Sequence, residues 1–162
     1  MVRNPVTPEG HAALEKQLKH EKSVVRLQIV KDIEEARAHG DISENSEFED
    51  AKERQAACDG RIRMLESALA SAEVIDIEKI PQNDRVVFGC WVQIENTDSG
   101  DERTYRIVGE SQSDVDNGLI SYKSPIARAL IGKTEGEEAV VQTPQGKVTY
   151  EVCEVHYSKD AP

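Results

Sequence analysis

Two helical stretches joined by a short bend occupy the first half of this 162-residue chain, and they constrain its fold more than any other feature. After the bend, apolar residues recur at alternating steps of three and four, the a/d spacing of a coiled-coil seam. The seam runs through Phe48, Ala51, Gln55, Cys58, Ile62, Leu65, Leu69 and Ala72, with Gln55 as its polar exception. Such a seam is buried only against another helix. We therefore expect an antiparallel hairpin with the stretch that precedes the bend.

The stretch before the bend predicts a long amphipathic helix with a less regular period. Thr7 is suited to cap it, Pro8 to take its first helical position, and Gly40 to end it. Its apolar row consists of Leu14, Leu18, Val25, Ile29, Ile33 and Ala36, and Lys22 interrupts the row. A hairpin of these two helices carries its bend at one end, which we call the tip (residues 39–47).

The tip is acidic. Residues 41–53 include six acids and one base, and Asp41 and Glu44 lie within one helical turn of each other. One interpretation is a capping box, with Asp41 as N-cap and Glu44 at the third helical position. The other is a metal site, because carboxylate oxygens are the ligands that Mg²⁺ takes in proteins. Spacing alone favours the capping box.

Two carboxylates make only part of a Mg²⁺ site, because this ion dehydrates reluctantly and usually shares its ligands with substrate phosphates. Such a site would be completed if the tip entered an active site that already supplies one Mg²⁺ and a phosphodiester. The tip would then help to hold a second ion, and one carboxylate would orient or deprotonate the attacking water.

The second half of the chain predicts a small, mostly antiparallel α+β domain over residues 85–162, after a linker at 80–84. The expected elements are strands at 85–94, 103–108 and 119–122, a short helix at 125–131 and a closing hairpin over 139–156. Residues 1–79 would form the helical hairpin. The fold class is therefore α+β, with a coiled-coil hairpin followed by a β domain.

Charge and composition narrow the function. The net charge of −11 repels free nucleic acid, so any action on nucleic acid is expected through a protein partner. The three cysteines lack the spacing of a zinc site or a disulfide framework and predict buried or half-buried thiols. The chain has no apolar run long enough to cross a bilayer, so we expect a cytoplasmic protein. The two helices of the hairpin bury the seam against each other and need no second chain, so we expect a monomer.

Basic residues occur along both arms and alternate with acids, which allows two interpretations. They form a solvated face of ion pairs between residues four apart in one helix, or they contact the end of a nucleic acid or the acidic walls of a partner's channel. The residues are Lys16, Lys19, Lys22, Arg26, Lys52, Arg54, Arg61 and Arg63.

Three separated segments resemble one known family. Residues 35–45 resemble the tip signature of the GreA/GreB family of bacterial transcript cleavage factors, and residues 103–109 and 119–133 resemble its C-terminal domain. The resemblance covers nearly the whole chain, with its motifs in the same order. One departure is Phe48, where the family often has tyrosine; a hydroxyl contact there would be lost, and packing would survive.

The resemblance implies both architecture and function. An FKBP-like C-terminal domain would dock on RNA polymerase at the rim of the secondary channel, and the coiled coil would enter that channel. Asp41 and Glu44 would be the catalytic carboxylates, and they would bind Mg²⁺ jointly with the polymerase at the 3′ end of a backtracked nascent RNA. Glu47 is a nearby acid with a weaker claim to a catalytic role. The protein would not be an enzyme by itself. The expected docking residues are Ile120, Ser121, Ser124, Pro125 and Ile126.

Two other functions remain open at this point. A protein of the same fold could bind the channel and modulate the polymerase without supporting cleavage, although the intact pair Asp41 and Glu44 argues against this. A coiled-coil adaptor could use the same acids only to cap a helix.

Overall fold

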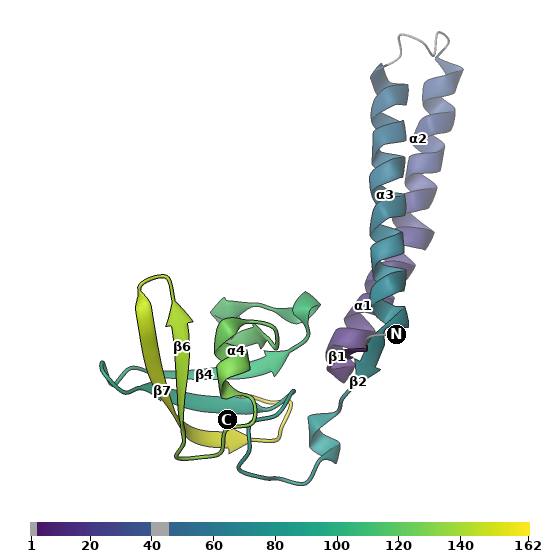
Figure 1. Cartoon of the computed structure of the whole chain (residues 1–162). Coiled ribbons are helices and arrows are strands. Elements are labelled where there is room, and N and C mark those ends of the chain that lie inside the picture. Colours follow the sequence, from purple (N-terminus) through teal and green to yellow (C-terminus); the bar gives the residue numbers. More distant parts are fainter. Residues whose placement is uncertain (1–2, 40–45) are drawn as a thin grey trace. The chain divides into compact units, whose positions relative to one another are not determined.

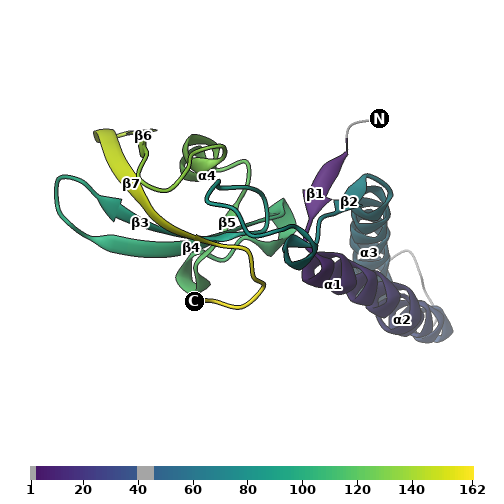
Figure 2. The ribbon, with the colours of Figure 1, turned by 90° about the horizontal axis from the view of Figure 1, so that it is seen from below.

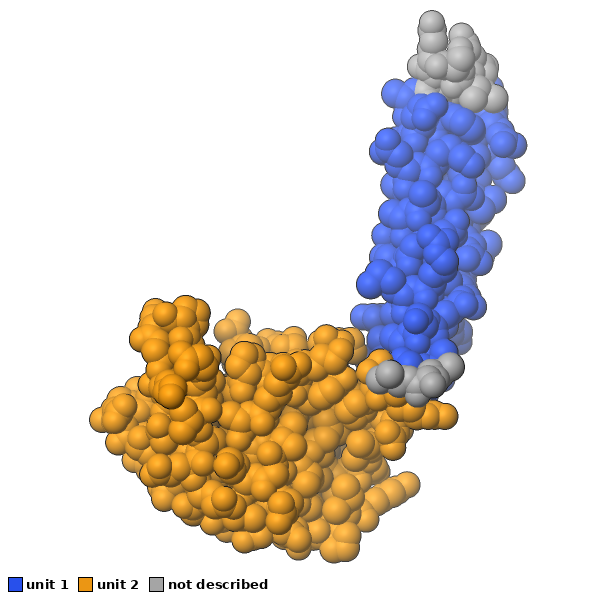
Figure 3. Space-filling view, in the orientation of Figure 1, with its two compact units in different colours: residues 1–2, 11–72 blue, residues 3–10, 73–162 orange. Residues whose placement is uncertain are grey.

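The computed structural model describes residues 3–39 and 46–162, and these divide into two compact units (Figure 3). Unit 1 contains His11–Ala72, and unit 2 combines Arg3–Gly10 with Glu73–Pro162. The boundary predicted from the sequence lies at residues 80–84. In the structure, residues 73–84 group with unit 2, and so do residues 3–10.

The helical arms form the predicted hairpin (Figure 1). The helical segments are α1 (Pro8–His20), a π-helical turn (Glu21–Val25), α2 (Arg26–Ala38) and α3 (Ser46–Ala70). The two apolar rows meet between the arms, where Ile29 and Ile33 of α2 pack with Ala51, Cys58 and Ile62 of α3. The predicted seam is therefore confirmed from Phe48 to Ile62. Leu65 and Leu69 are half-buried, and Ala72 lies beyond the end of α3.

The interruption of the first row at Lys22 falls within the π-helical turn. One extra residue in an α-helix is accommodated as such a turn. Here it directs Glu21 toward the second arm, where its carboxylate accepts hydrogen bonds from Arg61 Nε (2.8 Å) and Cys58 Sγ (3.3 Å). The irregular period was visible in the sequence, but the Glu21 contacts were not predicted.

Unit 2 is built on a five-stranded sheet with the order β5-β4-β3-β7-β6 (Figures 1 and 2). Its strands are β3 (Trp91–Asn96), β4 (Glu102–Val108), β5 (Leu119–Ser121), β6 (Glu138–Thr143) and β7 (Gly146–His156). All neighbours are antiparallel except β4 and β5, which are parallel. The sheet is mixed, and the prediction of a mostly antiparallel β domain is confirmed.

One short helix, α4 (Pro125–Leu130), packs against the sheet and closes the core. Ala127 and Leu130 of α4 are fully buried, together with Ile94, Ile107 and Val152 of the sheet. Ser124 caps α4, and Gly132 beyond it has a φ of +91°, a conformation that favours glycine. The predicted strand at 85–94 is shorter than expected, because β3 begins only at Trp91.

A second, two-stranded sheet was not predicted from the sequence. It pairs β1 (Asn4–Val6) with β2 (Ala72–Val74). Further along the chain, Gln82 binds the end of β7. Its amide nitrogen donates to Val155 O, and its oxygen accepts from Tyr157 N, each at 2.9 Å.

In the part of the chain that the structure describes, no helix combines the length and apolarity that a membrane crossing requires.

Candidate functional site

The predicted catalytic carboxylates, Asp41 and Glu44, lie outside the described residues. The structure describes the chain on both sides of them. α2 ends at Ala38, and α3 begins at Ser46. The candidate acids therefore belong to the segment that connects the two arms.

Two contacts join the arms next to this segment. His39 Nδ1 lies 3.4 Å from Glu47 Oε2, and the Arg37 guanidinium lies 5.9 Å from the centre of the Phe48 ring. Phe48 also packs against the buried seam. The expectation that packing survives without a tyrosine hydroxyl is therefore confirmed, and the Glu47 carboxylate lies beside the His39 imidazole.

Acidic side chains occupy the beginning of α3, with Glu47 and Glu49 in its first turn. Carboxylates there are stabilised by the positive end of the helix macrodipole. Further along, Arg54 lies between Asp50 of its own helix (3.2 Å) and Asp32 of α2 (2.9 Å). The hydrogen bond from Arg54 holds the pKa of Asp32 below its ordinary value.

Several basic residues of the arms form ion pairs that run from one arm to the other. The pairs are Lys22–Glu66 (3.2 Å), Arg26–Asp59 (3.6 Å), Arg54–Asp32 (2.9 Å) and Arg61–Glu21 (2.8 Å). These contacts support the interpretation of the basic residues as a solvated, ion-paired face. They differ from the expected pairs within one helix, because their partners lie on the opposite arm.

The predicted docking residues lie at the end of β5 and the beginning of α4. Ser124 Oγ donates to Ser121 O (2.7 Å) and accepts from Ala127 N (3.3 Å), and Ser121 Oγ accepts from Lys123 N (3.1 Å). Pro125 is exposed, and Ile126 is half-buried against the core. Both serine hydroxyls therefore shape the turn before α4.

Ile120 requires a correction. Its side chain is only 3% exposed and belongs to the core of unit 2. The alternation of side chains along β5 turns Ile120 inward, while its neighbour Ser121 is half-exposed. Ile120 can support a docking surface from below, but it does not offer its own surface to a partner.

The sheet also brings together a group of acids that the sequence analysis missed. Glu102, Glu95, Glu151 and Glu138 lie directly opposite one another on β4, β3, β7 and β6. Burial, and then the charges of Glu151, Glu95, Glu102 and Glu154, raise the pKa of the Cys153 thiol. Cys153 therefore stays protonated and is a poor nucleophile. Only the strand register could reveal this group, because its members are scattered along the sequence.

The cysteines agree with the prediction of buried or half-buried thiols. Cys58 and Cys90 are buried, Cys153 is partly buried, and all three are free. Burial raises the pKa of Cys90 to about 11. Burial, followed by the hydrogen bond with Glu21, also raises the pKa of Cys58.

Comparison with known proteins gives concordant results. Residues 4–74 match the family described as "Transcription elongation factor, N-terminal", and residues 81–157 match "Transcription elongation factor, GreA/GreB, C-term". Transcription elongation factor GreA of Psychrobacter cryohalolentis is 51% identical over 97% of this chain and 99% of its own length. GreA of Acinetobacter baumannii is 50% identical with the same coverage. Among solved structures, GreA factor homolog 1 (Gfh1) of Thermus thermophilus is 27% identical, covering 95% of this chain and 99% of that chain, with a TM-score of 0.43.

Proposed function

This chain belongs to the GreA/GreB family of transcription elongation factors, and we propose that it carries Asp41 and Glu44 into the secondary channel of RNA polymerase, where they support cleavage of a backtracked transcript. The observation that carries the proposal is the match to GreA proteins at about 50% identity over almost the full chain, tip included. The helical hairpin supports it, because the candidate acids connect the ends of its two arms.

The tip residues fit a Mg²⁺ ion by their chemistry. Asp41 and Glu44 offer carboxylate oxygens, the hard ligands that Mg²⁺ prefers. Two carboxylates do not complete its coordination, so we assign the remaining ligands to the polymerase active site and the RNA phosphate. When bound, the ion would stabilise negative charge at the phosphodiester and make its bound water more acidic.

The residues of the chain then have two roles. One carboxylate of the pair accepts the proton of the water that attacks the phosphodiester, acting as a general base. The other carboxylate would hold the ion in place and orient the attacking water. Asp41 and Glu44 also have the spacing of a capping box, whose helix would begin at residue 42, before the described start of α3 at Ser46. The capping interpretation therefore stays a prediction.

The partner in this proposal is RNA polymerase, and the substrate is the 3′ end of its nascent RNA. We assign docking to the surface around exposed Pro125, with Ser121, Ser124 and Ile126 beside it. In this proposal the protein supplies carboxylates to the active site of the polymerase, catalyses no reaction alone and acts as a monomer.

A cleavage assay tests the tip. Backtracked elongation complexes with labelled RNA would be mixed with Mg²⁺ and either the wild-type protein or the double variant Asp41→Asn, Glu44→Gln. These substitutions keep side-chain size and an N-cap acceptor but remove both charges. We expect the wild type to shorten RNA from its 3′ end, and the double variant to lose this activity while still binding polymerase. Glu47→Gln, which also removes a tip carboxylate, serves as the matched control and should retain most cleavage.

Each remaining outcome favours another function. Equal cleavage by the wild type and the double variant would refute the role of the carboxylates. Binding of the wild type without cleavage would favour a modulator of the polymerase. Failure of the wild type to bind polymerase would favour an adaptor.

A further inference from the structure

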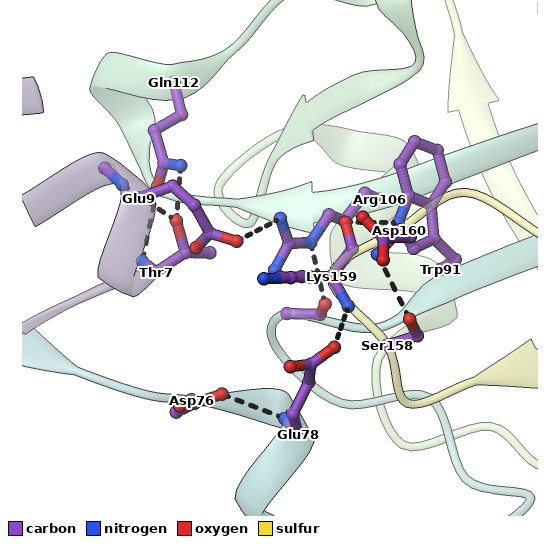
Figure 4. A network of polar contacts seen from close by, with 12 residues as sticks. Thr7, Glu9, Asp76, Glu78, Trp91, Arg106, Gln112, Ser158, Lys159 and Asp160 are labelled. Atoms are coloured by element: carbon purple, nitrogen blue, oxygen red, sulfur yellow. Dashed lines mark hydrogen bonds and ion pairs between the residues drawn. The ribbon is translucent and has the colours of Figure 1, made fainter.

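The first residues of the chain contain a buried polar contact that the proposed chemistry does not use. Thr7 is fully buried, and its Oγ1 accepts the N–H of Gly10 (3.1 Å), which caps α1. Gln112, more than 100 positions later, completes this cap (Figure 4). Its oxygen accepts from Thr7 N (3.3 Å) and Gly109 N (3.2 Å), and its amide nitrogen donates to Thr7 Oγ1.

A second contact holds the same turn of α1. The Arg106 side chain is only 7% exposed, and it extends from β4 toward Glu9, with Nη1 and Oε1 at 3.4 Å (Figure 4). Arg106 Nε also donates to Gly89 O at 3.0 Å. A buried guanidinium needs such partners, because an unpaired buried charge is costly. The first turn of α1 is therefore bound on two sides by residues of unit 2.

Gly10 marks how closely α1 approaches Gln112. A Cβ atom built at Gly10 would overlap Cδ and Oε1 of Gln112. Glycine is the least favourable residue for a helix apart from proline, so its presence in the first turn of α1 costs helix stability. Glycine at this position is explained by the close approach of Gln112, because a larger residue would collide with its side chain.

We propose that Gln112 is a positioning residue for transcript cleavage, acting with Arg106 through the first turn of α1. Residues 3–10 belong to unit 2, and α1 continues from them without a break into the first arm. Holding this first turn sets the point from which the arm extends, and hence where the tip acids are delivered once unit 2 has docked. Reactions of this kind depend steeply on the placement of reacting groups.

Two variants separate positioning from helix stability. Gln112→Ala removes the distant half of the cap. Gly10→Ala displaces Gln112 but gives α1 a better helix former. The matched control is Gly60→Ala in α3, where a new Cβ would meet only Arg63 Nη2, at 3.9 Å. Cleavage of backtracked complexes would be measured against factor concentration, with a thermal melt of each protein to confirm folding.

We expect Gln112→Ala and Gly10→Ala to lower the maximal cleavage rate on the order of 10-fold or more, at an unchanged half-saturating concentration. Gly60→Ala should cleave like the wild type. Gln112→Glu should restore the rate, because its carboxylate accepts from Thr7 N and Gly109 N, and the Thr7 hydroxyl can donate to it.

This inference rests on the proposed function, and the assay distinguishes their failures. If the wild type does not cleave, or the Asp41→Asn, Glu44→Gln variant cleaves equally, the proposed function fails. If those controls behave as expected, but Gln112→Ala and Gly10→Ala reach the wild-type maximal rate, the positioning role is refuted. A loss of cleavage that appears only as a higher half-saturating concentration would also refute it, because it would indicate weaker docking.

Discussion

Single residues at the seam determine how firmly the two arms are joined. Glu21 connects the arms through Arg61 and Cys58, and only 15% of its side chain is exposed. The hydrogen bond from Arg61 holds the pKa of Glu21 below its ordinary value of 4.5. The charged form of Glu21 therefore stabilises the folded hairpin, and this stabilisation has a defined pH dependence.

Glu21→Gln should lower the free energy of unfolding of the hairpin by about 1 kcal/mol at pH 7, because one partner of a partly screened ion pair is lost. The contribution of Glu21 is fully present above the unfolded-state pKa near 4.5 and is lost as pH falls through the lower folded-state value. The difference between wild type and variant should thus be constant from pH 7 to about pH 5 and shrink below about pH 4. Urea unfolding followed by helical circular dichroism measures it.

The matched control for this change is Glu34→Gln, which removes an exposed carboxylate of the same arm that has no ion-pair partner among the described residues. It should leave the unfolding curve unchanged. A difference between Glu21→Gln and the wild type that was as large at pH 3 as at pH 7 would contradict the assigned role of the Glu21 charge.

At the scale of elements, the start of α4 determines the shape of the surface assigned to docking. Ser124 caps the helix and donates to Ser121 O, so its hydroxyl makes two of the hydrogen bonds that hold the turn. The helix then buries Ala127 and Leu130 against the sheet. A change at Ser124 is therefore expected to act first on stability, and on docking only through the shape of this turn.

Ser124→Ala should destabilise unit 2 by about 1 kcal/mol, because the N–H of Ala127 loses its cap. Ser124→Asp keeps an acceptor at the N-cap but loses the hydrogen bond to Ser121 O, so it should be destabilised less than Ser124→Ala. Fluorescence of Trp91, the only tryptophan in the chain, reports the unfolding of unit 2. Equal unfolding midpoints for the alanine and aspartate variants would show that the cap does not stabilise α4.

At the scale of the whole molecule, residues 3–10 belong to the unit formed by the second half of the chain. Val6 is 6% exposed and Thr7 is fully buried, and both lie in unit 2, although the entire hairpin separates them from β3 in sequence. The N-terminal strand β1 therefore contributes to the stability of the C-terminal domain.

Val6→Ala should shift the unfolding transition reported by Trp91, with a loss of about 2 kcal/mol for the two buried methyl groups and the cavity they leave. Val24→Ala, a change of the same type at a half-exposed position of the first arm, should not shift the Trp91 signal. If Val6→Ala changed only the helical signal of the hairpin, residues 3–10 would not stabilise unit 2.

The sequence by itself determined the hairpin, the seam, the cap of α1, the strands β4 to β7 and the helix α4. Each of these follows from a local pattern: a period of apolar residues, a capping side chain, or a glycine where the backbone turns. The candidate carboxylates Asp41 and Glu44 were found in the same way, since they lie within one turn, and their role stays a prediction because they lie outside the described residues.

Only the tertiary structure decided which distant residues meet. The cap shared by Thr7 and Gln112, the pairing of Glu9 with Arg106 and the row of glutamates across β4, β3, β7 and β6 all join positions far apart in the chain. The burial of Ile120 likewise depended on which face of β5 turns inward. Local patterns carry no information on such contacts, because strand register and long-range packing are fixed only when the whole chain packs around a common core.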